Sequence, residues 1–224
     1  MYDQLTIGSK ASFDDFRASI AERKIGMPAK KKIKETVPFS NITHDFSRIN
    51  GEQYWDERTL EYVFELTAST PEELEELKQA FANWVMNVAA EEIHDPHIPD
   101  FHFLGTFDSI DPSDDEGLDK TTITVKFTAY PYMIANALKE FSVEVPAGEE
   151  GTLTIVNGSS HPVVPTITVD AGVLLKIGTT SYALSAGTTT DERLKLAPGV
   201  TSVTVQNAGA TACTVAATIR EEVF

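Results

Sequence analysis

Apolar and polar residues alternate between Thr59 and Thr67, and this pattern predicts a strand. Leu60, Tyr62, Phe64 and Leu66 point to one face, while Glu61 and Glu65 lie on the other. A repeat of two residues is typical of a strand that buries one face and exposes the other. We therefore predict a half-buried antiparallel strand.

A helix is expected directly after this strand. Thr70 is suited to cap its first free N–H groups, Pro71 fits the first helical position and Glu73 completes a capping box. The following apolar residues recur at spacings of three and four: Leu74, Leu77, Phe81, Trp84, Val85 and Val88. Such a broad apolar face packs against a sheet.

The first part of the chain is predicted to be an α+β domain, residues 1–137, with one helix packed on an antiparallel sheet. The remaining expected strands lie around Ile7, at Arg17–Ile25, Lys30–Val37, Phe101–Ile110 and Thr121–Ala129, with a helical turn or bend at Ser12–Phe16 and a hairpin turn at Asp111–Gly117. Pro131 ends strand pairing at the close of the domain.

The composition changes near Ala137, where charged residues become few and Thr, Val and Gly become frequent. Seven short strands separated by turn residues are predicted at Phe141–Val145, Thr152–Asn157, Val163–Val169, Val173–Ile177, Ser181–Leu184, Val200–Gln206 and Cys213–Ile219. They predict an all-β sandwich over residues 138–224. Cys213 alternates with apolar residues and is expected in its core.

The formal net charge of −16 narrows the classes of partner. So acidic a surface repels phosphate backbones and anionic lipids, so we expect neither nucleic-acid binding nor membrane insertion. A single cysteine excludes an intrachain disulfide. The N-terminus lacks the pattern of a secretory signal, and no apolar run nears the length of about 20 residues that a membrane helix needs. We expect a soluble protein made in a cytoplasm.

No pattern in the sequence indicates an enzyme or a cofactor. It contains no nucleophile elbow, phosphate-binding loop or dinucleotide fingerprint. The best metal candidate is Glu91–His102, which holds three histidines and several carboxylates. Zinc accepts such ligands, but their spacing matches no closed zinc pattern, and Pro96 and Pro99 exclude a helical ligand pair. A polar loop is the preferred interpretation, and we assign no metal site from the sequence.

The candidate interface residues lie before the strand at Thr59. Lys30, Lys31, Lys32 and Lys34 form the one dense basic run, which suits either a solvated edge strand or an acidic protein partner. Residues 39–58 are polar and form a long loop or the tip of an extended hairpin. Within them, Tyr54 and Trp55 either anchor a partner or pack on their own sheet.

The order of several short motifs resembles the distal tail proteins of siphophages, the Dit family. In the first part these are Pro28-Ala29-Lys30-Lys31, Tyr54-Trp55-Asp56-Glu57-Arg58, Ala82-Asn83-Trp84-Val85, Asp95-Pro96 before Phe101–Phe107, and Phe127-Thr128-Ala129-Tyr130-Pro131-Tyr132. In the second part the Asn157-Gly158 turn, Pro162–Val169 and Leu194–Val200 fit the family's galectin-like or carbohydrate-module-like sandwich.

The resemblance implies a non-enzymatic structural protein of a phage or prophage virion. Such proteins form a homo-hexameric ring at the tail tip, which joins the tail-tube protein to a tail-associated hub or fibre protein of the baseplate, and they are assembled in the bacterial host cytoplasm. On this basis Lys30–Lys34 of one subunit is expected to meet acidic residues of the next, Asp111–Asp119. The alternative is a carbohydrate- or cell-wall-binding adaptor. The sandwich counts against it, because its only aromatic residues are Phe141, Tyr182 and Phe224.

Overall fold

The structure is a computed structural model that describes residues 3–36, 38–49, 51–113 and 119–224. The fold is mostly β. The chain divides into two compact units, Met1–Met133 with Phe224 (unit 1) and Ile134–Val223 (unit 2), which are described separately. Strand β10 (Met133–Val145) runs without interruption through residues 137 and 138, where the change in composition places a domain boundary.

Unit 1 is an antiparallel sheet with helices at its surface. Its elements are β1 (Thr6–Ile7), β2 (Lys10–Ala11), α1 (Ser12–Phe16), β3 (Ala18–Ile25), β4 (Lys34–Thr36), β5 (Thr43–Asp45), β6 (Arg58–Thr67), α2 (Pro71–Met86), β7 (Glu91–His94), β8 (Phe101–Pro112) and β9 (Lys120–Ala129). The strands pair in the order β3-β6-β9-β8-β7-β1-β2. β6 lies second in this order, between β3 and β9, and its formation follows from its alternating sequence.

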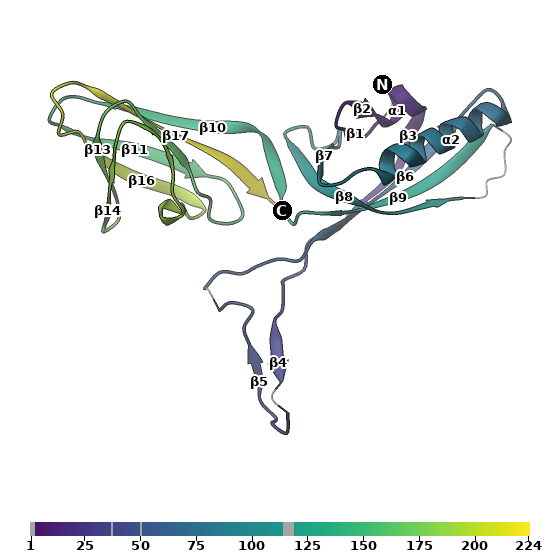
Figure 1. Cartoon of the computed structure of the whole chain (residues 1–224), viewed down its shortest axis with the longest axis horizontal. Coiled ribbons are helices and arrows are strands. Elements are labelled where there is room, and N and C mark those ends of the chain that lie inside the picture. Colours follow the sequence, from purple (N-terminus) through teal and green to yellow (C-terminus); the bar gives the residue numbers. More distant parts are fainter. Residues whose placement is uncertain (1–2, 37, 50, 114–118) are drawn as a thin grey trace. The chain divides into compact units, whose positions relative to one another are not determined.

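The predicted strand and helix at the core are both confirmed. Leu60, Tyr62, Phe64 and Leu66 of β6 are fully buried. Helix α2 lies along one face of the sheet (Figure 1). Its Phe81 ring makes edge contacts with Phe64 at 5.0 Å and Trp84 at 5.7 Å between centroids. Aromatic pairs of this kind add to the burial of their large apolar area.

The start of α2 also follows the sequence signal, with one difference. The Thr70 hydroxyl accepts a hydrogen bond from the Glu73 amide at 3.2 Å. The Glu73 carboxylate accepts from the Ser69 amide at 2.8 Å, one residue before the cap instead of at the cap itself. The amides of Glu73 and Ser69 lie at the start of the helix, where no carbonyl of the helix can accept from them. Each contact therefore satisfies a free N–H group.

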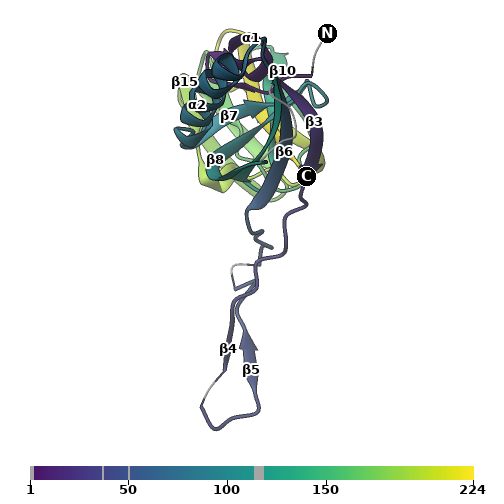
Figure 2. The same cartoon turned by 90° about the vertical axis from the view of Figure 1, so that its right-hand side faces the viewer.

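The described residues between 39 and 57 belong to a hairpin, which was one of the two interpretations left open by the sequence. We call the described part of residues 26–57 the hairpin. β4 and β5 pair with each other, with Glu35 opposite His44. Figures 1 and 2 both show this hairpin extending away from the sheet of unit 1. The strand predicted at Lys30–Val37 is shorter, because β4 covers only Lys34–Thr36; Val37 lies outside the described residues. Lys30 instead makes an isolated bridge with Trp55.

A short strand absent from the sequence prediction follows α2. β7 (Glu91–His94) pairs with β8 on one side and with β1 on the other. The sequence favoured a polar loop here because one apolar residue, Ile93, is too few to show a period. Ile93 is fully buried, so pairing with neighbours fixes this strand.

Unit 2 contains the seven predicted strands and one more. Its elements are β10, β11 (Glu150–Asn157), β12 (Thr166–Val169), β13 (Val173–Ile177), β14 (Thr180–Leu184), β15 (Gly187–Thr190), the 3-10 helix η1 (Glu192–Leu194), β16 (Gly199–Gln206) and β17 (Cys213–Val223). The strands pair in two orders, β15-β12-β17-β10 and β11-β16-β13-β14. Apolar residues of both sets share one core, in which Cys213 is fully buried as predicted.

The additional strand β15 contains glycine and threonine only. Thr188 and Thr190 pair with Thr168 and Thr166 of β12, with 3.1 Å between the hydroxyl oxygens of each pair. Without an apolar alternation, such a strand gives no sequence signal and depends on its cross-strand partners. Among the described residues, no helix combines the length and the apolar character that crossing a membrane requires.

Candidate functional site

The basic run of the hairpin is exposed. Lys30, Lys31, Lys32 and Lys34 all face solvent and line one hollow of about 290 Å³, together with Asp45. Hydrogen bonds from Ser47, and then the charges of Lys34 and Lys32, hold the pKa of the Asp45 carboxyl below its usual value. The structure therefore gathers the four lysines into a solvated surface that can receive an acidic group.

Tyr54 and Trp55 take different roles. The Trp55 ring makes an edge contact with Phe224, with 4.6 Å between centroids, and Lys30 Nζ lies 5.8 Å from the Trp55 ring centroid. Tyr54 is 43% exposed. Trp55 thus packs on its own chain, whereas Tyr54 stays accessible to a partner.

The rest of the hairpin presents large apolar side chains to solvent. Twelve such side chains are exposed among the described residues, and seven of them lie here: Met27, Ile33, Phe39, Ile42, Phe46, Ile49 and Tyr54. Phe39 is fully exposed, and Ile49 is 73% exposed. Exposed apolar side chains gathered in one segment mark an interaction surface.

The acidic segment expected to meet these lysines is described only at its ends. Asp111 lies exposed at the end of β8, and Asp119 precedes β9. Residues 114–118 of the predicted hairpin turn lie outside the described residues. The contact between Lys30–Lys34 and this segment stays a prediction.

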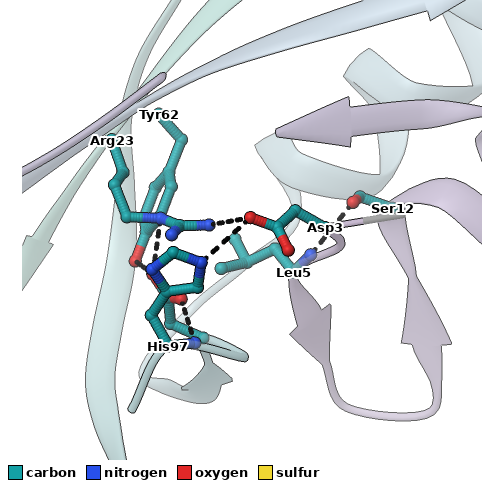
Figure 3. Close-up of polar contacts among 7 residues, drawn as sticks. Asp3, Leu5, Ser12, Arg23, Tyr62 and His97 are labelled. Atoms are coloured by element: carbon teal, nitrogen blue, oxygen red, sulfur yellow. Dashed lines mark hydrogen bonds and ion pairs between the residues drawn. The ribbon is translucent and has the colours of Figure 1, made fainter. Parts of the chain in front are cut away.

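A polar cluster joins the start of the chain to the sheet. Figure 3 shows the Asp3 carboxylate facing both Arg23 of β3 and His97. One oxygen of Asp3 lies 2.9 Å from Arg23 Nη2 and 3.1 Å from His97 Nε2. Asp95, whose side chain is fully buried, lies 3.4 Å from Arg23 Nε and accepts a hydrogen bond from the Tyr62 hydroxyl at 3.1 Å.

The electrostatics of this cluster indicate a structural role. The hydrogen bond from Arg23 lowers the pKa of Asp3, so the carboxylate stays ionised in its ion pair. Burial, followed by the Asp95 charge, raises the pKa of Tyr62 far above its usual value. Tyr62 is therefore a neutral donor that holds Asp95, and the cluster anchors the turn that follows β7.

A second polar cluster contains three of the residues in the Glu91–His102 segment. Glu92 and His94 of β7 and His102 of β8 place one ligand atom each within 4.8 Å of one another. His97 belongs instead to the Asp3 cluster. Pro96 and Pro99 exclude ligands on a helix, but the pairing of β7 with β8, which the sequence does not display, brings these residues together.

Arg58, the last residue of the Tyr54–Arg58 motif, is a buried cation for which the sequence suggested no role. Its side chain is 2% exposed, and its Cζ lies 5.5 Å from the Phe103 ring centroid. Within the described part of the chain, its Nε and Nη2 have no hydrogen-bond partner. Burial lowers the pKa of the Arg58 guanidinium below its ordinary value. This unusual residue begins β6, directly after the hairpin.

Tyr182 is one of the few aromatic residues that the sandwich offers for stacking on a sugar. It borders a hollow of about 450 Å³ with Arg193. Its hydroxyl donates a hydrogen bond to the Arg193 carbonyl at 2.9 Å, and the side chain is half-buried. Tyr182 is thus held by its own unit, so the adaptor interpretation gains no support here.

Comparison with known proteins supports a relationship in fold. No family model and no curated protein matches the sequence. Among solved structures, the crystal structure of the Dit protein (gp 19.1) of phage SPP1 matches 98% of this chain and 99% of its own, with a TM-score of 0.68 and 13% identity. A chain of the phage p2 baseplate in its activated conformation with Sr aligns over 96% of this chain, with a TM-score of 0.44 and 7% identity.

The alignment with SPP1 Dit extends over almost the whole of both chains, so it includes unit 1 and unit 2 alike. At 13% identity the agreement concerns the path of the backbone. This chain has the fold of the SPP1 Dit protein.

Proposed function

We propose that this chain is a distal tail protein of a siphophage or prophage, a non-enzymatic component of the virion tail tip. Six copies form a ring that joins the tail-tube protein to a hub or fibre protein of the baseplate, and assembly takes place in the cytoplasm of the bacterial host. The likeness in fold supports this proposal, because SPP1 Dit is described as a paradigm of the hub adsorption apparatus in phages that infect Gram-positive bacteria.

The two parts of the chain have different roles in this proposal. Residues 1–137 form the ring as an α+β domain, and residues 138–224 form a galectin-like β-sandwich that projects from it. The separation of the described chain into two compact units near this boundary is consistent with such a division. A ring of identical subunits requires a head-to-tail contact whose rotation closes.

The hairpin is the observation that carries the proposal. Seven large apolar side chains are exposed between residues 27 and 54 in the single subunit, and such a gathering favours burial against a partner. Burying one such side chain completely stabilises a contact by about 1.5–3 kcal/mol. Burial of several of them would outweigh the entropy lost when two subunits associate.

The charge distribution favours a second copy of this chain as the occupant. Residues 26–57 contain five Lys and Arg and five Asp and Glu, whereas the whole chain has 18 basic and 34 acidic residues. The hairpin is therefore neutral overall, with four of its basic residues gathered at Lys30–Lys34, on a molecule that is strongly acidic elsewhere. Opposite charges steer such surfaces together.

Two exposed apolar residues of the hairpin provide the sharpest test. We expect the double variant Phe39→Asp/Ile42→Asp to be monomeric under conditions in which the parent chain forms a ring, since both side chains lie in solvent in the single subunit. Val200→Asp in unit 2 is the matched control, because Val200 is 70% exposed outside the hairpin. Light scattering on a sizing column measures the mass. A double variant that retains the parent mass would contradict the proposed interface.

A second test concerns the basic run. Reversing Lys30, Lys31 and Lys32 to Glu is expected to weaken ring assembly, and most strongly at low salt, because salt screens the attraction between exposed charges. A control that reverses Lys126, Lys176 and Lys195 changes the net charge by the same amount outside the hairpin. Equal assembly of both variants at every salt concentration would refute the electrostatic contact.

A further inference from the structure

We propose that Glu92, His94 and His102 form a binding site for a divalent transition metal, with zinc as the preferred ion. Glu92 and His94 are two residues apart on β7, so their side chains share one face of the strand. The intervening Ile93 points into the core, where it is fully buried. The strand alternation therefore separates the polar face from the apolar one.

The pairing of β7 with β8 supplies the third ligand. Ile93 lies opposite Phe103, and Glu92 lies opposite Leu104. One further step in this antiparallel register sets His94 against His102. Directly opposed residues of neighbouring strands have Cβ atoms only about 4.5–5.5 Å apart, so two imidazoles in these positions can reach the same ion. The two rings lie 5.2 Å apart between centroids.

The distances between the ligand atoms suit a small ion. Glu92 Oε2 lies 3.3 Å from His94 Nε2, and Glu92 Oε1 lies 3.7 Å from His102 Nε2. With zinc bonds of about 2.0–2.1 Å, ligands at the corners of a tetrahedron are about 3.3 Å apart. Small side-chain rotations therefore bring the three groups to the separations that the ion requires.

The chemistry of the ligands selects the class of ion. Two imidazoles and a carboxylate suit zinc and neighbouring first-row metals, whereas calcium and magnesium prefer oxygen ligands alone. His102 is 3% exposed, so the surrounding protein holds its ring in place. The side chains of His94 and Glu92 are 39% and 58% exposed. The ion can therefore enter from solvent. Three protein ligands leave a fourth position for water or for a side chain of another chain.

The bound ion would fasten β7 to β8 at the edge of the polar loop that leads from one strand to the other. The pairing of β7 with β8 lies within one subunit and does not require the ring. This inference is therefore independent of the function proposed above. Because the ion binds the folded arrangement of the two strands, it should also raise the temperature of unfolding.

The test uses the full chain without a histidine tag, freed of metal by dialysis against a chelator and then titrated with Zn²⁺ by calorimetry. We expect one equivalent to bind. The variants His94→Gln and Glu92→Gln replace accessible side chains and should each weaken binding by more than about tenfold, since even outer partners of metal ligands matter by 10–100-fold. His97→Gln is the matched control, because His97 lies in the loop between β7 and β8 and contacts Asp3.

Unfolding temperatures and Co²⁺ absorption test the same site even if one variant is unstable. Zn²⁺ should raise the unfolding temperature of the parent and of His97→Gln, and it should leave that of His94→Gln unchanged. Co²⁺ should show the visible absorption of a four-coordinate ion with the parent chain and with His97→Gln, and should not show it with His94→Gln. The proposal is overturned if the parent binds no equivalent of Zn²⁺, or if His97→Gln loses as much affinity as His94→Gln.

Discussion

Replacement of Asp95 by alanine tests how the start of the chain is held to the sheet. The Asp95 carboxylate is fully buried and contacts three groups: the Tyr62 hydroxyl at 3.1 Å, the His97 amide at 2.9 Å and Arg23 Nε at 3.4 Å. The variant leaves a buried hydroxyl without its acceptor and a largely buried guanidinium with Asp3 as its remaining partner. Removing one member of a buried ion pair costs about 3–5 kcal/mol, and we expect a loss in this range.

Tryptophan fluorescence during urea unfolding measures this loss in the relevant unit. The only tryptophans, Trp55 and Trp84, both lie in unit 1, so their signal follows that unit. Asp95→Asn keeps one acceptor oxygen and should lose less than Asp95→Ala, about 1–2 kcal/mol, since a neutral hydrogen bond is worth about 1 kcal/mol. Asp100→Ala removes an exposed carboxylate from the same loop and should stay within about 0.5 kcal/mol of the parent. A loss below about 1 kcal/mol in Asp95→Ala would refute the reasoning from buried ion pairs.

Three further predictions concern the core, a buried cation and pH. Phe81→Ala should lower the free energy of unfolding of unit 1 by about 3–5 kcal/mol in the same urea assay, because it empties the space between α2 and β6; a loss under about 1 kcal/mol would contradict the packing described. Arg58→Met should instead stabilise unit 1 in that assay by about 1–3 kcal/mol, since it removes two buried donors without partners; a clear loss would show that Arg58 is satisfied. Hydrogen bonds from Arg193 lower the pKa of Asp191 to about 2 from 3.8. As the pH falls, the Asp191 carboxylate therefore takes up a proton in the unfolded chain before it does so in the folded one. Its stabilising effect is complete above pH 3.8 and is lost between pH 3.8 and about pH 2. The difference in melting temperature between the parent and Asp191→Asn, measured by calorimetry, should shrink over this window, and a difference independent of pH would contradict the assignment.

The fold could be predicted where burial imposes a strong period. β6 and α2 have four and more apolar residues at regular spacings, and the structure places both as expected. β7 and β15 could not be predicted in the same way, because β7 has a single buried apolar residue and β15 has none of large size. Their structure depends on strands distant in sequence, whose pairing a local pattern does not contain.

The candidate sites show the same division between local and distant information. The four lysines of the hairpin and Tyr54 could be proposed as contact residues from the sequence, because each stands out in its own segment. The approach of Glu92 and His94 to His102 depends on the register of β7 against β8, which the sequence does not display. Arg58 resembles any surface arginine until the strand that begins with it is placed in the core.

The mass of the purified parent chain in solution tests the central claim most directly. Light scattering across a range of protein concentrations should give about six times the chain mass of 24.5 kDa, and negative-stain images of the same peak should show rings with six-fold symmetry. A closed two-fold dimer, or a monomer at every concentration both alone and when mixed with the cognate tail-tube and hub proteins, would contradict the proposed ring.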